Sequence, residues 1–173
     1  MDLYPGAGVI AIFDLDGSKE REALLADYKA TRTEMPESLR KQFPEIRRVT
    51  RLMGIAVVEA SGVEADDLIG SAAFSLASRG EEALIVSADK DLAQCVKPGV
   101  RQLLPPPTAN PRLGWRTLDE AAVQEKFGVR ADQIADYLAL VGDSSDNIPG
   151  LAGVGPKTAA SWLRSYGSLE GII

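Results

Sequence analysis

The sequence contains no histidine and a single cysteine, Cys95. Without histidine, Ser-His-Asp and Cys-His nucleophilic sites and histidine-ligated metal centres are excluded, which leaves carboxylates, lysine, arginine, tyrosine and hydroxyl groups for chemistry. One cysteine excludes an intrachain disulfide and fits a reducing compartment, so we expect a cytoplasmic protein. No apolar run approaches the ~18 residues of a membrane-spanning helix, and we expect no membrane partner.

The chain is acidic, with a net charge of −6 at pH 7, which by itself argues against a nucleic-acid partner. Eight of its acids, however, stand in motifs that suggest a cation site. Setting these eight aside leaves a balance of +2, and bound cations would offset their charge. The acidity therefore does not exclude DNA. The eight residues are Asp14, Glu64, Asp66, Asp67, Asp89, Asp91, Asp143 and Asp146.

Short apolar runs alternate with helical periodicities, which predicts an α/β sheet followed by a helical C-terminal third. Polar residues 15–35 favour a loop or a pair of short helices over the site. We expect strands at residues 9–13, 55–58, 83–86 and 100–104. We expect helices at residues 36–53 and 131–141, and a last helix from the turn at 153–157 to Gly167. Two more helices are expected to begin at capping boxes: one at Ser61 and Glu64, which ends at Gly80, and one at Thr117 and Glu120, which ends at Phe127.

The acidic motifs fall at positions that lie together in such a fold. Asp14 and Asp89 each follow a buried strand, so both stand at the carboxyl edge of the sheet, where α/β proteins bind ligands. Glu64 and Asp66 begin a helix reached from a strand. Helix capping explains any one of these acids equally well, but so many at one edge would repel unless cations neutralised them. Carboxylates suit Mg²⁺ or Mn²⁺, and two ions ~4 Å apart would clamp a phosphate and activate water.

Three motifs carry a family resemblance. They are residues 63–67 (Val-Glu-Ala-Asp-Asp), 87–91 (Ser-Ala-Asp-Lys-Asp) and 142–150 (Gly-Asp-Ser-Ser-Asp-Asn-Ile-Pro-Gly). In order and spacing they resemble the 5′→3′ exonuclease domain of bacterial DNA polymerase I, a member of the flap endonuclease family. Asp14 looks like that family's acid after its second strand. Residues 28–32 (Tyr-Lys-Ala-Thr-Arg) are similar to its helical arch, and residues 153–158 (Gly-Val-Gly-Pro-Lys-Thr) to its helix-turn-helix DNA clamp.

The resemblance implies a PIN-like, mostly parallel sheet with flanking helices at residues 1–128, including a basic arch segment at 15–53, and a helix-hairpin-helix-type subdomain at 129–173. The eight acids would ligate two Mg²⁺ or Mn²⁺ ions. Lys29 and Arg32 would contact the scissile phosphate as catalytic residues. The turn at 153–158 would hold a DNA phosphate with backbone N–H groups and bind K⁺ through carbonyls. The implied DNA-binding residues are Tyr28, Gly153, Val154, Gly155, Lys157 and Thr158.

The implied activity is hydrolysis of DNA phosphodiesters at 5′ ends or 5′ flaps, in replication and repair. In a bacterium the protein would be associated with the nucleoid. The resemblance also allows a polymerase domain in the full-length protein, and we expect a monomer.

Two alternatives stay open. The family begins with a strand ending in Asp-Gly and continues its DNA-binding region with further helices, so we expect a truncated form, and a DNA-binding remnant with impaired catalysis is the first alternative. A haloacid-dehalogenase-type phosphatase is the second, because residues 13–17 (Phe-Asp-Leu-Asp-Gly) and the Gly142-Asp143 pair look like its motifs. There Asp14 would be the nucleophile and Asp16 the acid/base. That alternative leaves the acids at 64–67 and 89–91 without a role.

Overall fold

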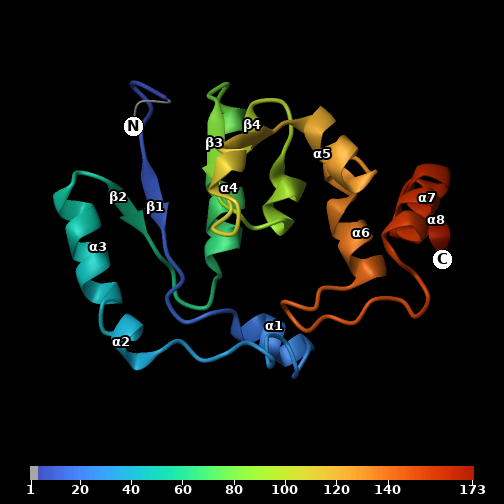
Figure 1. Cartoon of the computed structure of the whole chain (residues 1–173), viewed down its shortest axis with the longest axis horizontal. Coiled ribbons are helices and arrows are strands. Elements are labelled where there is room, and N and C mark those ends of the chain that lie inside the picture. The colour runs from blue at the N-terminus through green and yellow to red at the C-terminus, as the bar shows by residue number, and fades with distance from the viewer. Residues whose placement is uncertain (1–3) are drawn as a thin grey trace. The chain divides into compact units, whose positions relative to one another are not determined.

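The computed structural model describes residues 4–173, which form two compact units (Figure 1). The N-terminal unit comprises residues 4–26 and 32–68, and the C-terminal unit comprises residues 27–31 and 69–173. The boundary falls inside helix α4 (Ala65–Ser78), whose first turn belongs to the N-terminal unit. Within residues 4–173, none of the helices combines the length and the apolar character that crossing a membrane requires.

Two short parallel strands form the centre of the N-terminal unit. Ile10 pairs with Ala56 and Ile12 with Val58, inside the two apolar runs that predict strands here. As far as the structure describes the chain, these strands pair only with each other, and Ile10 stays 48% exposed. Helix α3 packs against β2. The elements of this unit are β1 (Ile10–Ile12), α1 (Lys19–Leu24), α2 (Glu37–Arg40), α3 (Phe43–Leu52), β2 (Ala56–Val58) and the start of α4.

The single helix predicted at residues 36–53 is wrong. The structure has two helices there, α2 and α3, separated by a turn at Lys41 and Gln42. Pro44 explains the break. Proline has no backbone N–H, and in a continuous helix its ring would collide with the carbonyl four residues earlier, whereas the first turn of a helix tolerates it. Pro44 accordingly lies in the first turn of α3.

A three-stranded sheet forms the centre of the C-terminal unit. Its strands are β3 (Ala83–Val86), β4 (Val100–Leu104) and β5 (Arg116–Leu118), with β3 and β4 parallel and β4 and β5 antiparallel. Among the described residues β3 pairs with β4 alone, and Val86 is 59% exposed. Apolar residues of α4 pack against β3 and β4 around Val100.

Strand β5 is not predicted by the sequence pattern. Thr117, expected to begin a helix through a capping box, instead lies opposite Leu103 in β5. Helix α5 (Glu120–Phe127) begins after Asp119, whose carboxylate accepts a hydrogen bond of 2.8 Å from the backbone N–H of Ala122. Aspartate caps a helix at least as well as threonine. The helix therefore begins two residues later than expected, and Thr117 is left free to extend the sheet.

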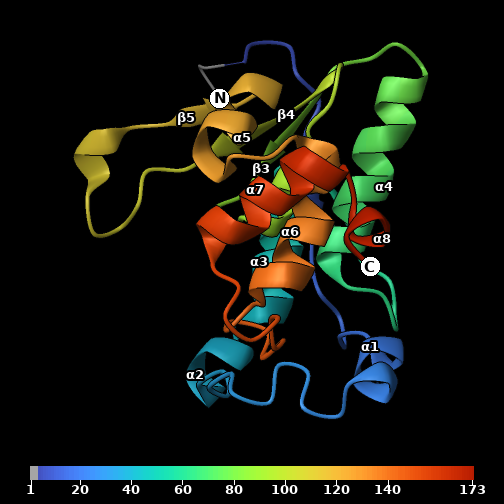
Figure 2. The same ribbon diagram turned by 90° about the vertical axis from the view of Figure 1, so that its right-hand side faces the viewer.

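The C-terminal helices share one core with this sheet. Leu104 and Leu118 of the sheet pack in the same cluster as Val123, Ile134 and Leu163 of the helices. Helices α6 and α7 lie side by side (Figure 2). The helical region predicted at 131–141 and the end of the next helix at Gly167 are confirmed. The helices are α6 (Ile134–Val141), α7 (Pro156–Tyr166) and α8 (Leu169–Ile172), with single 3₁₀ turns at Asp91–Cys95, Pro111–Leu113 and Ala131–Gln133.

The loop at residues 142–150 is closed by two glycines. Asp143 and Ile148 exchange two backbone hydrogen bonds of 2.8 Å. Gly142 adopts a φ of +81°, which favours glycine. A side chain on Gly150 would overlap the carbonyl group of Val141, and one on Gly142 would overlap the backbone of Gly150. The loop therefore depends on a backbone contact that only glycine permits.

Replacing Gly150 by alanine tests this contact. We expect Gly150→Ala to lower the free energy of unfolding by at least about 2 kcal/mol, because backbone atoms must move apart to admit the methyl group. Gly155→Ala is the matched control, since a methyl group there meets no atom within 4 Å. Urea denaturation measures both. Equal losses in the two variants would contradict the close contact.

Candidate metal and nucleic-acid site

Four of the predicted metal ligands stand around the start of α4 in the N-terminal unit. Asp14 follows β1, and its carboxylate accepts a hydrogen bond of 2.6 Å from the backbone N–H of Ala65, the first residue of α4. Glu64 is buried directly before the helix, and Asp66 and Asp67 lie in its first turn. A helix start favours negative charge because its backbone N–H groups are unpaired. Because Asp14 follows β1 and α4 follows β2, its parallel neighbour, the chain places these four acids near the start of α4.

Arg21 of α1 pairs with two of these acids. Its guanidinium donates two hydrogen bonds to Asp67, of 2.7 and 2.8 Å, and lies 3.1 Å from an oxygen of Glu64. The Glu64 side chain is only 7% exposed. A buried carboxylate without a cation would be costly. The Arg21 guanidinium therefore lies between the carboxylates of Glu64 and Asp67, both of which are predicted metal ligands.

The predicted capping box at Ser61 and Glu64 is wrong. Helix α4 begins at Ala65, and the Ser61 hydroxyl instead donates a 2.5 Å hydrogen bond to Asp16. Asp16 also accepts from the backbone N–H of Gly62 at 2.8 Å. The hydrogen bond from Ser61, helped by that from Gly62, holds the pKa of Asp16 below its ordinary value. A general acid needs a raised pKa, so this environment does not suit the role that the phosphatase alternative gives Asp16.

Asp89 and Asp91 follow β3 in the C-terminal unit. The Asp89 carboxylate accepts a hydrogen bond of 3.0 Å from the backbone N–H of Asp91, which starts a 3₁₀ turn. Gln102 of β4 is fully buried and donates to the carbonyl oxygens of Ser87, at 3.1 Å, and Asp89, at 2.6 Å. A buried side chain with two such bonds fixes the backbone of the loop. Gln102 therefore positions the Asp89 and Asp91 side chains.

Lys90 bridges Asp91 to Asp143. Its ammonium nitrogen lies 2.9 Å from an oxygen of Asp91 and 2.6 Å from an oxygen of Asp143. The Asp143 side chain is 7% exposed, and its other oxygen accepts from the backbone N–H of Ser145 at 2.8 Å. Each oxygen of this buried carboxylate thus accepts a hydrogen bond. The loop closed by Gly142 and Gly150 brings Asp143 into this position.

The pKa shifts of this group follow from its contacts. Burial alone would raise the pKa of Asp143, but hydrogen bonds from Lys90 and Ser145 outweigh it and hold the pKa below its ordinary value. Burial raises the pKa of Asp91 despite the opposing ammonium of Lys90. Burial would lower the pKa of Lys90, but hydrogen bonds to its two carboxylate partners raise it. Asp143 therefore stays ionised more readily than Asp91.

The segment with the predicted catalytic lysine contacts Asp146. The backbone N–H of Lys29 donates to the Asp146 carbonyl at 2.9 Å, and the Tyr28 hydroxyl lies 3.2 Å from an Asp146 carboxylate oxygen. The Lys29 ammonium lies 4.0 Å from that carboxylate and 4.8 Å from the Tyr28 ring centre. Asn147 donates to the Asp27 carbonyl at 2.8 Å. The structure thus brings Tyr28 and Lys29 to a predicted metal ligand, while Arg32 follows as an exposed residue.

The predicted DNA clamp is a turn followed by a helix, as expected. Gly153 adopts a φ of +79°, and Gly155 precedes α7, which has Pro156 at its start. Val154 packs against the core, whereas Lys157 is exposed. No side chain caps this helix start. The backbone N–H groups of its first turn, which include those of Lys157 and Thr158, are therefore available to an anion.

The eight predicted metal ligands divide equally between the two units, with Asp14 and 64–67 in one and Asp89, Asp91 and 143–146 in the other. In the described part of the chain, no three acids or cysteines come close enough to form a metal site. The donor set nevertheless fits a hard cation, because carboxylate oxygens are the ligands such ions take. The Lys90 ammonium shows that one positive group already fits between Asp91 and Asp143.

Three residues of the site are missed by the sequence patterns. They are Arg21, Lys90 and Gln102. Gln102 carries a usable signal, since it is a polar residue inside an apolar strand, and Lys90 stands inside an acidic motif. Arg21 lies in a polar segment of mixed charge, where nothing distinguishes it from its neighbours.

The fold combines a resolvase-like, PIN-type α/β domain with a C-terminal SAM-like helical fold. Two family models match the chain: "5′-3′ exonuclease, N-terminal resolvase-like domain" over residues 2–128, and "5′-3′ exonuclease, C-terminal SAM fold" over residues 129–173. The chain belongs to the 5′-3′ exonuclease family. This confirms the family and the fold class that the motifs predict.

Named relatives are longer than this chain. A 5′-3′ exonuclease of Aquifex aeolicus is 41% identical over 95% of the chain, which spans 55% of that protein. DNA polymerase I of Pseudomonas aeruginosa is 42% identical over 95% of the chain, which spans 17% of it. Among solved structures, the T5 5′-exonuclease with bound divalent metal ions (zinc) is 25% identical, with a TM-score of 0.78 over 99% of this chain and 65% of that one. The chain thus spans about half of its exonuclease relative.

Replacing Lys90 by methionine tests whether its ammonium occupies a cation position. We expect Lys90→Met to lower the free energy of unfolding in metal-free buffer by about 1–2 kcal/mol, because Asp143 loses its partner. Mn²⁺ should then stabilise the variant more than the wild type, because the ion no longer competes with the ammonium. Thermal melting with and without Mn²⁺ measures both effects.

Lys41→Met is the matched control, since Lys41 also pairs with a carboxylate, that of Glu37 at 2.7 Å, but both side chains are more than 70% exposed. Its melting shift with Mn²⁺ should equal that of the wild type. An equal Mn²⁺ shift in all three proteins would show that Lys90 does not stand in a cation site.

The lowered pKa of Asp143 predicts that the free energy of unfolding falls at acid pH. An aspartate whose folded pKa lies below its unfolded value of 3.8 stabilises the fold above that value, and this contribution disappears as the pH falls through the folded pKa. Asp143→Asn should therefore be less stable than the wild type near neutral pH, and the difference should shrink below about pH 4. Urea denaturation across this range measures it. A difference that grows toward acid pH would mean that the pKa is raised.

Proposed function

We propose that this protein is a metal-dependent 5′→3′ exonuclease and 5′-flap endonuclease that hydrolyses DNA phosphodiesters. The observation that carries the proposal is the arrangement of carboxylates in two groups, each already bound to a cationic side chain, Arg21 in one and Lys90 in the other. Such groups suit hard cations. The family of the chain and the divalent ions bound by the T5 5′-exonuclease support the same conclusion.

We infer that the eight acids hold two Mg²⁺ or Mn²⁺ ions. Asp14, Glu64, Asp66 and Asp67 are the proposed ligands in one unit, and Asp89, Asp91, Asp143 and Asp146 are those in the other. When bound, such ions clamp a phosphate and lower the pKa of a water molecule. The protein's own contribution is to hold the carboxylate oxygens in place. Gln102 does this by binding the Asp89 carbonyl, and the glycine-closed loop does it by positioning Asp143.

Lys29 and Arg32 are the proposed catalytic residues. The Lys29 ammonium is held near Asp146 by its own backbone hydrogen bond, so it would face a phosphate bound at that ligand. A fixed positive charge there stabilises negative charge that develops on the phosphate oxygens. Tyr28, whose hydroxyl contacts the same aspartate, would contact the DNA. Arg32, three residues on and exposed, would add a second, bidentate donor.

The region 129–173 is the proposed DNA-binding part, and residues 1–128 the proposed nuclease core with the arch segment at 15–53. Backbone N–H groups at the start of α7 would bind a phosphate, with Lys157 adding charge. Gly153, Val154, Gly155 and Thr158 would shape this turn, and K⁺ is proposed at its carbonyls. A polymerase domain in the full-length protein, a monomeric state and a cytoplasmic, nucleoid-associated location stay predictions.

The decisive experiment uses a 5′-labelled flap DNA with and without Mg²⁺. Cleavage that requires Mg²⁺ supports the proposal. Structure-specific binding without cleavage would identify a DNA-binding remnant instead. Hydrolysis of p-nitrophenyl phosphate without DNA cleavage would favour the phosphatase alternative.

Variants of two lysines separate catalysis from binding. Lys29→Ala should reduce turnover by about 10²–10³-fold with little loss of DNA affinity, because its charge acts in the transition state. Lys157→Ala should instead weaken binding to all DNA sequences and lower the salt slope by about one. Single-turnover cleavage and DNA titration at several salt concentrations measure the two effects.

Lys29→Arg is the control for charge, and it should retain more activity than Lys29→Ala. If Lys29→Ala weakens binding without reducing single-turnover cleavage, its assignment as a catalytic residue is wrong.

A further inference from the structure

The segment between β4 and β5, together with the first residue of β5, projects from the three-stranded sheet as an exposed arm (residues 105–116; Figure 2). Four prolines restrict its backbone, at positions 105, 106, 107 and 111. A 3₁₀ turn at Pro111–Leu113 and a hydrogen bond of 3.0 Å from the Asn110 N–H to the Pro107 carbonyl order its outer part. The arm is thus exposed but conformationally restricted, which lowers the entropy lost on binding.

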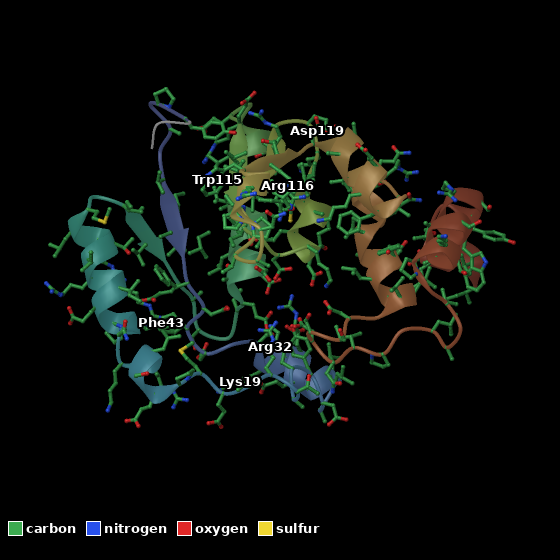
Figure 3. The ribbon with its side chains drawn as sticks, in the orientation of Figure 1. Lys19, Arg32, Phe43, Trp115, Arg116 and Asp119 are labelled. Carbon is green, nitrogen blue, oxygen red and sulfur yellow. The ribbon has the colours of Figure 1, made fainter. Side chains whose placement is uncertain are left out.

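The end of the arm combines an exposed aromatic ring with unpaired positive charge. Trp115 is 50% exposed beside Arg116 (Figure 3), and Leu113 is 52% exposed. Within residues 4–173, Arg112 and Arg116 have no carboxylate within ion-pair distance and both are exposed. By contrast, Arg79, Arg101 and Arg130 of this unit each pair with an acid, and Arg164 donates a hydrogen bond of 3.4 Å to the Gly128 carbonyl. In an acidic chain, two unpaired arginines around a tryptophan are a distinct surface.

A third positive charge lies nearby. Lys126 of α5 is exposed. Partial desolvation of its ammonium lowers the pKa of Lys126, and the positive charge of Arg116 lowers it further. Like charges so placed are unfavourable unless an anionic partner neutralises them.

The arm leaves the sheet at the edge that carries the predicted metal ligands. Because β3 and β4 are parallel, the end of β4 and the loop after β3 lie at the same edge, and β5 begins there, with Arg116 opposite Leu104. The Ser87 N–H donates to the Leu103 carbonyl at 3.2 Å, and Gln102 binds the Asp89 carbonyl. Two strand spacings, about 10 Å, separate β5 from β3. The start of β5 therefore lies at the same sheet edge as the loop that carries Asp89.

The geometry points to the arm as a binding surface for single-stranded DNA, with Trp115 stacked on a base and Arg112 and Arg116 paired with phosphates. The inference rests on the proposed nuclease function, since it names where one strand of the substrate lies. Any base can stack on an aromatic ring, and arginine forms bidentate hydrogen bonds with phosphate. Because neither contact depends on the identity of the base, the surface would bind DNA without sequence preference. Leu113 adds apolar contact next to the ring.

Tryptophan fluorescence tests the arm directly. The chain has two tryptophans, and Trp162 packs against the core, so the full chain carrying Trp162→Phe reports on Trp115 alone. We expect a dT oligonucleotide in EDTA to quench this fluorescence. Trp115→Ala should weaken dT binding, measured by anisotropy, about 5- to 100-fold. Arg112→Ala and Arg116→Ala should each lower the salt slope by about 0.7. The paired, exposed Arg130→Ala is the control and should leave the slope unchanged.

Unchanged dT affinity in Trp115→Ala, with an unchanged melting temperature, would overturn the inference. So would quenching by blunt duplex DNA but not by dT, and so would a wild type that does not bind dT. Mg²⁺-dependent cleavage of labelled flap DNA by the same wild type decides the proposed function separately. A wild type that cleaves DNA while Trp115→Ala binds and cleaves equally well would therefore reject the arm and keep the nuclease.

Discussion

Repulsion among carboxylates is the constraint on which this structure depends. Four acids lie around the start of α4 in one unit, and four others lie after β3 and in the glycine-closed loop of the other unit; several are half-buried or buried. Such a group is stable only with positive charge among its oxygens. The chain supplies it locally, through Arg21 between Glu64 and Asp67 and through Lys90 between Asp91 and Asp143. These side chains therefore offset part of the negative charge within each unit.

The same contacts determine how firmly each acid is held. Asp143 is fixed by a loop that only glycine permits and by hydrogen bonds from Lys90 and Ser145. Asp89 is held through its backbone carbonyl, which accepts a hydrogen bond from Gln102. Asp67 is instead held by a long, partly exposed arginine side chain. Lys29 reaches its position through a backbone hydrogen bond and a left-handed φ of +56°, which is unfavourable for a lysine and persists because the surrounding loop holds it.

The sequence predicts most of the elements, because these depend on local patterns, and the residues of the site stay a prediction. Apolar runs mark four of the five strands, and the acids follow them. Boundaries fail where two local signals compete: Pro44 divides a helix that its apolar spacing predicts as continuous, and Asp119 displaces Thr117 as the helix cap. The contacts of Arg21 and Lys90 arise between distant parts of the chain, 46 and 53 residues apart, so no local pattern contains them.

Strands β1 and β3 are each paired on one side only, and this affects how the protein behaves at high concentration. As described for residues 4–173, each of these strands presents one row of backbone donors and acceptors without a strand beside it, next to the exposed apolar side chains Ile10 and Val86. Such an edge accepts a strand from any chain that offers one. Charged side chains would discourage this, but the apolar residues here favour it. Pairing of these edges between molecules should accordingly increase with protein concentration.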